Sequence, residues 1–211
     1  MGKNNYKIKK GQVWVETVTY ILIALVLIGV VYSFASKAIE QQKDKRILES
    51  YIDALNSLDN VIDEVRKAGP GNKREFSFVV NDKSEGKFVV NPWDGTSGNN
   101  ISFEIKKSAY AASEVGRGIH DDRGIDVEIP ATNLKVRTDE VGEEGKRGTL
   151  YDVKIWREFD ENKFKLQFEG EVERGELSKS STPYKLIIEN LGKEISGISP
   201  DVVRININVL R

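Results

Sequence analysis

The stretch that decides the fold is KKGQVWVETVTYILIALVLIGVVYSFAS, residues 9–36. Between Gln12 and Ser36 its only charged side chain is Glu16. From Thr17 to Ser36 there are about 20 residues, which as a helix extend roughly 30 Å, enough to cross the hydrocarbon core of a bilayer. The eleven residues before Gln12 carry four lysines and no acidic residue. The positive-inside rule therefore predicts a cytoplasmic N-terminus, with the rest of the chain outside.

The helix is expected to continue beyond the apolar run. Residues 37–67 contain no proline or glycine, and apolar side chains recur there at steps of three and four, which predicts an amphipathic helix ending at Gly69-Pro70-Gly71. Residues 40–46 (EQQKDKR) are polar on every side and are predicted to be an exposed joint. We favour a helix packed on its own domain, the alternative being a coiled coil between chains. The apolar stripe comprises Leu48, Tyr51, Leu55, Leu58, Ile62 and Val65.

The remaining chain, residues 73–211, is predicted to be rich in strands. Apolar and polar residues alternate in several short segments, and turn-rich segments separate them. Together with the helix this predicts an α+β fold, in which a long N-terminal helix, first transmembrane and then amphipathic, packs on a C-terminal antiparallel β-sandwich-like head. The candidate strands are residues 76–80, 87–90, 101–105, 125–129, 151–155, 164–168, 185–188 and 203–209.

Composition excludes several classes of function. The 211 residues include 32 basic and 33 acidic side chains, a formal net charge of −1, which gives no electrostatic basis for binding nucleic acid. There is no cysteine, so disulfides and thiolate metal sites are excluded. With a single histidine and no phosphate-binding or nucleophile-elbow motif, the chain is not expected to be an enzyme or to carry a cofactor.

Glu16 requires a partner, because a carboxylate at the edge of the hydrocarbon region is costly. If the chain is cut after Gly11, Gln12 carries a new α-amino group, and Glu16 becomes the fifth residue, one helical turn away. In a bundle of such helices, Glu16 of one subunit could pair with the Gln12 amine of its neighbour. That pair would satisfy two charges in an apolar core and would fix the axial register between subunits.

The combination of Lys9, Lys10, Gly11, Gln12 and Glu16 with the apolar run resembles the class III (prepilin-type) signal peptide and mature N-terminus of archaeal type IV pilins. Trp14 is a departure, since that pattern often has serine at this position. The resemblance covers residues 1–36. It implies a leader at residues 1–11 and a hydrophobic transmembrane and assembly helix at 12–36. With the apolar spacing and alternation described above, the chain then continues as an amphipathic helix at 37–68 and a β-rich head at 73–211, which would be extracellular.

What the resemblance implies is a structural subunit of an extracellular filament, without enzymatic activity. Its expected partners are a prepilin peptidase that cleaves between Gly11 and Gln12, an assembly ATPase, a platform protein and further copies of the same chain. Before assembly the subunit would span the membrane once, and afterwards it would lie in a surface filament whose heads are available for adhesion. The alternative is an uncleaved signal anchor carrying an extracellular β-sandwich binding domain.

Two further segments offer polar groups of the kinds found in binding or modification sites. The segment around His120, Asp121, Asp122 and Asp126 offers oxygen and nitrogen ligands, but its spacing fits no calcium loop or zinc signature, so a polar loop is the preferred interpretation and no metal is expected. Asn100-Ile101-Ser102 is an N-glycosylation sequon next to a turn-rich segment, which makes Asn100 a candidate for glycosylation.

Overall fold

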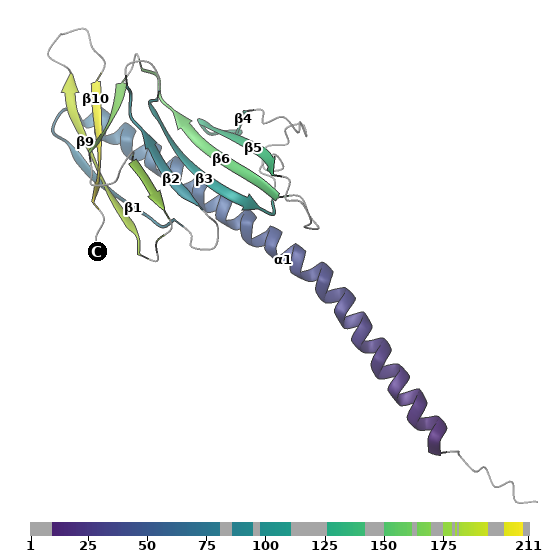
Figure 1. The fold of residues 1–211 in the computed structure, drawn as a ribbon. Helices are drawn as coiled ribbons and strands as arrows, with labels where there is room; N and C mark the ends of the chain where they lie inside the picture. Colours follow the sequence, from purple (N-terminus) through teal and green to yellow (C-terminus); the bar gives the residue numbers. More distant parts are fainter. Residues whose placement is uncertain are drawn as a thin grey trace, which may run out of the picture. The chain divides into compact units, whose positions relative to one another are not determined.

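The protein is described by a computed structural model. The structure describes residues 10–80, 86–94, 98–110, 126–141, 150–161, 164–169, 175–178, 180, 182–193 and 201–208. Two compact units are distinguished, Met1–Glu40 and Gln41–Arg211, and one helix, α1 (Lys10–Ala68), contributes residues to both. The strands all belong to the second unit, which we call the head (Figure 1).

The first unit consists, in its described part, of the N-terminal half of α1. From Trp14 to Ile39 its large apolar side chains are exposed, Trp14 by 72% and Phe34 by 75%. By length and composition this helix is able to cross a membrane. An apolar surface of this extent on a single chain requires lipid or other protein to cover it.

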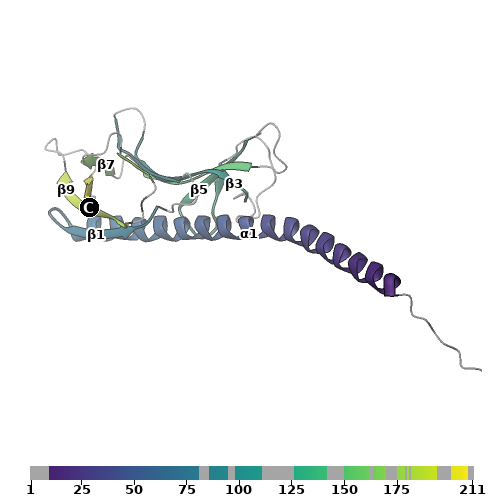
Figure 2. The ribbon, with the colours of Figure 1, turned by 60° about the horizontal axis from the view of Figure 1, so that its bottom comes forward.

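Within the head, residues 41–68 of α1 lie along the strands (Figure 2). The predicted stripe is buried from Leu48 to Val65, and Ile47 extends it by one residue. The interpretation that this helix packs on its own domain is therefore confirmed. The helix ends as predicted: Gly69 has a φ of 89°, the left-handed conformation that suits a glycine after the last turn, and its N–H bonds to the carbonyl of Arg66.

The described strands form two sheets. The four-stranded sheet has the order β1-β9-β10-β7, and the six-stranded sheet has the order β4-β5-β6-β3-β2-β8. The strands are β1 (Lys73–Phe78), β2 (Lys87–Asn91), β3 (Asn100–Ser108), β4 (Val127–Glu128), β5 (Leu134–Val141), β6 (Leu150–Glu158), β7 (Phe164–Glu169), β8 (Glu176–Ser178), β9 (Tyr184–Lys193) and β10 (Asp201–Asn208).

Three features of the sheets differ from the sequence-based expectation. The pair β7–β10 is parallel, whereas every other described pair is antiparallel. Alternation identifies a strand but not its direction, and the long connection between these two strands allows either one. Strands β5 and β8 were not predicted. β5 keeps buried side chains at alternate positions only for Leu134 and Val136 and then becomes polar, while β8 has three residues.

One core joins the helix to both sheets. Tyr51 of α1 stacks on Phe103 of β3 with ring centroids 4.3 Å apart and an interplanar angle of 6°. Phe78 from the four-stranded sheet contacts Phe103 at 5.6 Å, edge to face, and Phe88 at 4.5 Å. These rings connect the two sheets beneath the helix, and each such aromatic pair adds about 0.5–1.5 kcal/mol to the burial of its area.

Asp44 and Lys45 show that the polar stretch at residues 40–46 is not exposed throughout. The Asp44 carboxylate accepts the backbone N–H of Ala109 at 2.6 Å, and the Lys45 ammonium lies over the Tyr110 ring at 5.9 Å. Both side chains are half-buried. The head therefore holds α1 from Asp44 onwards, through polar contacts first and the apolar stripe afterwards.

The other face of the six-stranded sheet carries cross-strand ion pairs. Lys154 of β6 pairs with Glu104 of β3 at 3.2 Å, and Lys106 of β3 with Asp152 of β6 at 2.7 Å. The hydrogen bond that the Lys106 ammonium donates to the Asp152 carboxylate raises the pKa of Lys106 above its ordinary value, with burial acting in the opposite direction. These residues alternate along β3 with the buried Phe103 and Ile105, as expected for a sheet with one face in the core.

The stripe gives a test of which part of α1 stabilises the head. Leu55→Ala should lower the free energy of unfolding by about 2–5 kcal/mol, because Leu55 is 1% exposed and its loss leaves a cavity against the sheets. Leu25→Ala is the matched control, since Leu25 lies on the same helix and is 59% exposed. Chemical denaturation of the detergent-solubilised chain measures both. Equal effects of the two substitutions would contradict the proposed packing.

Candidate functional site

The N-terminal residues predicted to act in processing and assembly lie at the start of α1. Gly11 and Gln12 are in its first turn, and Glu16 follows with an exposed side chain. Beside it, the Thr19 hydroxyl donates to the carbonyl of Val15 at 2.8 Å, so this hydroxyl is satisfied within the helix. The described part of a single chain therefore offers Glu16 to an outside partner, in an apolar stretch without another charge before Lys37.

Asn100 is the first residue of β3 and is paired in register with Asn91 of β2 and Glu158 of β6. Its Oδ1 accepts a hydrogen bond of 2.9 Å from Nδ2 of Asn91, and its side chain is half-buried. Ser102, the third residue of the sequon, is 0% exposed. The sequon thus lies within a central strand, with its hydroxyl covered, and not in the preceding turn.

Of the predicted polar segment, the structure describes Asp126 alone. His120, Asp121 and Asp122 are outside the described residues. Asp126 is described, and its carboxylate pairs with Nε of Arg137 at 2.7 Å. Within the described ranges, no three histidine, cysteine, aspartate or glutamate side chains come together in a way that would hold a metal ion.

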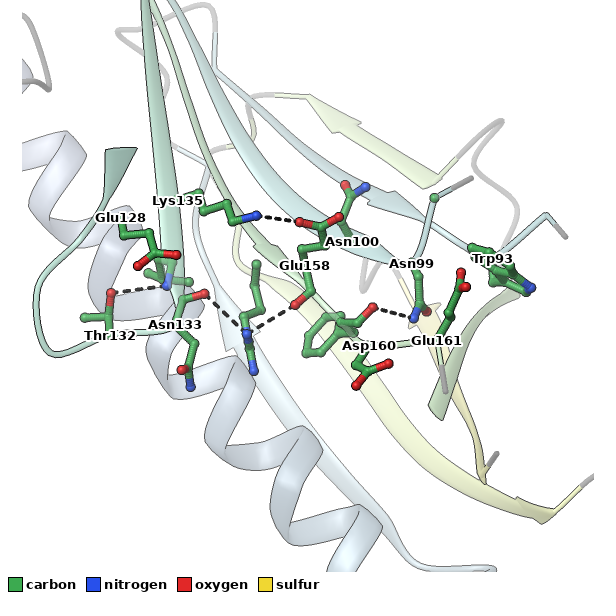
Figure 3. Close-up of a pocket in the computed structure, with 14 residues that line it drawn as sticks. Trp93, Asn99, Asn100, Glu128, Thr132, Asn133, Lys135, Glu158, Asp160 and Glu161 are labelled. Carbon is green, nitrogen blue, oxygen red and sulfur yellow. Dashed lines mark hydrogen bonds and ion pairs between the residues drawn. The ribbon is translucent and has the colours of Figure 1, made fainter. Parts of the chain in front are cut away.

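A polar pocket lies on the head where β3 begins and β6 ends (Figure 3). Its volume is about 630 Å³, within the range of small-molecule sites. The turn between β4 and β5 forms one wall, and the segments before β3 and after β6 form the others. Side chains lining it include Trp93, Asn100, Glu128, Asn133, Lys135 and Glu161.

The segments around this pocket are among the turn-rich segments that the sequence predicts between strands. The turn-rich stretch at residues 91–100 and the DENK segment at 160–163 flank it in the chain. What brings them together is the β3–β6 pairing, which places Asn100 opposite Glu158. The sequence does show asparagine, acidic residues and Trp93 concentrated in two turns next to strands. Only the pairing of those strands shows that the two turns lie side by side.

Two ion pairs hold the basic side chains of the pocket. Lys135 pairs with Glu158 at 2.7 Å, and this hydrogen bond raises the pKa of Lys135 above its ordinary value, while burial acts in the opposite direction. Nε of Arg157 pairs with Asp59 of α1 at 3.0 Å, and its guanidinium lies 5.1 Å from the centre of the Phe159 ring. The Arg157–Asp59 pair also links the pocket wall to the helix.

Asn99 fixes the back of the pocket. It is 1% exposed and has a φ of 62°, which is the left-handed conformation that asparagine tolerates better than most residues. Its Nδ2 donates to the carbonyl of Phe159 at 2.9 Å, and its Oδ1 accepts the N–H of Leu166 in β7 at 2.7 Å. One buried amide therefore ties the start of β3 to the end of β6 and to the other sheet.

Two substitutions of Asn99 distinguish what its hydrogen bonds contribute to stability from what its left-handed backbone conformation requires. Asn99→Gly should lower the free energy of unfolding by about 1–3 kcal/mol, because the buried groups of Phe159 and Leu166 lose their partner. Asn99→Ala should cost about 1–2 kcal/mol more, because alanine is strained at positive φ. Thermal denaturation of both variants measures the difference. If the Asn99→Ala variant were as stable as the Asn99→Gly variant, the left-handed conformation of residue 99 would be refuted.

Comparisons with known proteins give no relative for this chain: no family model, no curated protein and no solved structure matches it. Functional inference therefore depends on the geometry of the helix and the head.

Proposed function

We propose that this protein is a structural subunit of an extracellular type IV pilus-like filament, assembled through its N-terminal helix. The observation that carries the proposal is the exposed apolar surface of α1 from Trp14 to Ile39, whose charged residues are Glu16 near its start and Lys37 near its end. The same helix continues into the head, where its buried stripe attaches it to the strands. A subunit so built can exchange lipid for neighbouring helices while its head remains folded.

Covering this surface keeps it out of water, either in lipid or among neighbouring helices. Burying one leucine or isoleucine side chain contributes roughly 1.5–3 kcal/mol relative to leaving it in water. Lipid tails are equally apolar, so the choice between bilayer and helix bundle depends on packing and on polar pairs. Glu16 supplies such a pair in this proposal, because the α-amino group of a neighbour's Gln12 would neutralise it inside the bundle.

The proposal includes the partners that the N-terminal motif implies. A prepilin peptidase would cut between Gly11 and Gln12, and an assembly ATPase and a platform protein would move the subunit out of the membrane. The subunit would be a single-pass membrane protein with a cytoplasmic N-terminus before assembly and part of a surface filament afterwards. It would have no catalytic activity or cofactor of its own.

A second candidate function is an uncleaved signal anchor that carries an extracellular binding domain. The pocket on the head favours it, because a volume of about 630 Å³ is large enough for a small ligand. The two functions differ at the N-terminus: the anchor retains residues 1–11, and the filament subunit loses them.

The processing step gives the first test of the proposal. Mature protein isolated from cells should begin at Gln12, and Gly11→Phe should block maturation, because a bulky side chain would not fit where the peptidase accepts glycine. Mass spectrometry of the N-terminus measures both. Filaments built from chains that still carry Lys3 would refute processing, and an intact N-terminus without filaments would favour the anchor.

Glu16 gives the second test, which addresses assembly. Glu16→Ala should leave membrane insertion and cleavage intact, since losing a charge in the apolar stretch eases insertion. Filament yield should fall sharply, because the neighbour's amine would be buried without a counter-charge. Electron microscopy counts filaments, and immunoblots measure processed protein.

Glu16→Gln and Glu49→Ala complete this experiment. The glutamine keeps the shape and the hydrogen-bonding capacity of the side chain but should still impair assembly. Glu49 is an exposed carboxylate on α1 within the head, so Glu49→Ala should assemble normally. Normal filaments from Glu16→Ala would rule out the assembly role.

A further inference from the structure

We infer that the polar pocket of the head binds a neutral carbohydrate. The inference concerns the head alone and stands whether or not the chain forms filaments. It begins from the lining, in which amide, hydroxyl and charged side chains predominate, with the indole of Trp93 at one end (Figure 3). Such a lining cannot hold an apolar ligand, because its polar groups would lose water without gaining hydrogen bonds.

The lining of the pocket is acidic and disfavours an anionic ligand. Four carboxylates line it, those of Glu128, Glu158, Asp160 and Glu161, beside the two basic side chains of Lys135 and Arg157. The two basic groups are already held by Glu158 and Asp59. A ligand whose groups both donate and accept hydrogen bonds without net charge satisfies such a mixed lining, and the hydroxyls of a sugar are such groups.

The hydrogen-bonding capacity left in the pocket suits hydroxyl groups. Oδ1 of Asn100 accepts from Asn91, so Nδ2 of Asn100 is left as a donor for a ligand. In the described part of the chain, the Glu128 and Glu161 carboxylates have no hydrogen-bond or ion-pair partner and are available as acceptors. Hydrogen bonds to charged groups are stronger than those between neutral groups, so two or three of them are enough to orient a sugar.

Trp93 supplies the apolar platform that a sugar ring requires. Its side chain is half-buried, and its backbone N–H donates to the carbonyl of Leu166 at 3.1 Å, which fixes the segment that carries it. The C–H groups on one face of a pyranose are apolar and can lie against the indole, while the hydroxyls at the ring edge face the polar groups.

The walls of the pocket are fixed before any ligand binds. Asn99 joins three segments at its back through a buried amide, and Arg157 joins its side to Asp59 of α1. A preformed pocket avoids the entropy cost of ordering side chains on binding, which matters for a small ligand that offers few contacts.

The test uses the full chain in detergent micelles and ligand-observed NMR. The panel contains glucose, galactose, mannose and N-acetylglucosamine, with glucosamine and glucuronic acid as charged counterparts and trilysine as a peptide probe. At least one neutral sugar should bind more tightly than either charged counterpart and than trilysine. Trp93→Ala and Glu161→Ala should each weaken its binding at least about tenfold.

Matched substitutions and a folding check make the result decisive. Trp14→Ala changes a tryptophan of the apolar segment, and Glu140→Ala an exposed carboxylate of β5 outside the pocket. Both should bind the sugar as the unsubstituted chain does, and circular dichroism should show unchanged melting for all four variants. Three results would overturn the inference: no neutral sugar binds, only trilysine binds, or binding survives both pocket substitutions in folded protein.

Discussion

Tyr51 of α1 stacks on Phe103 of β3, and the head is organised around this contact. The stripe that contains Tyr51 packs with side chains of both sheets in a common core. Removing the helix would uncover the face of Phe103 that Tyr51 stacks on, and Phe103 is in ring contact with both Phe78 and Phe88. The helix is therefore a layer of the head and not only its attachment to an apolar segment.

Two buried asparagines hold the ends of this arrangement. Asn99 connects β3, β6 and β7, as described above. Asn190 of β9 does the same at the end of α1: its Nδ2 lies 3.4 Å from the carbonyl of Val65 and 3.3 Å from that of Arg66, and its Oδ1 accepts the N–H of Gly192 at 2.8 Å. Each amide offers donors and an acceptor at one position. In both places that combination lets one side chain bond to backbone groups of different elements.

The elements that could be predicted from the sequence are those with a long, regular pattern. The helix and its stripe follow from apolar residues at steps of three and four, and β3 and β6 follow from clear alternation. β5 could not be predicted, because its polar residues after Val136 are stabilised by pairing with β6.

The pocket could not be predicted for a related reason: Asn99 and Phe159 are 60 residues apart, and only the strand register brings them together. Glu16 was predicted to be significant from its isolation in the chain, and its exposed side chain is consistent with a partner outside the subunit.

The length over which α1 is embedded determines how the head would respond to a mechanical load. The buried stripe from Ile47 to Val65 spans roughly 27 Å along the helix axis. A pull along that axis, applied where α1 enters the head, would act in shear on all the stripe contacts at once and would not peel them one at a time. The far end is secured too, because Gly71 donates to the Asn190 carbonyl at 2.7 Å and the Asn190 N–H bonds to Asn72 at 3.1 Å. Separating the helix from the sheets by tension would thus require the aromatic stack and the terminal hydrogen bonds to break at the same time. The head is therefore expected to resist unfolding when force is applied along α1.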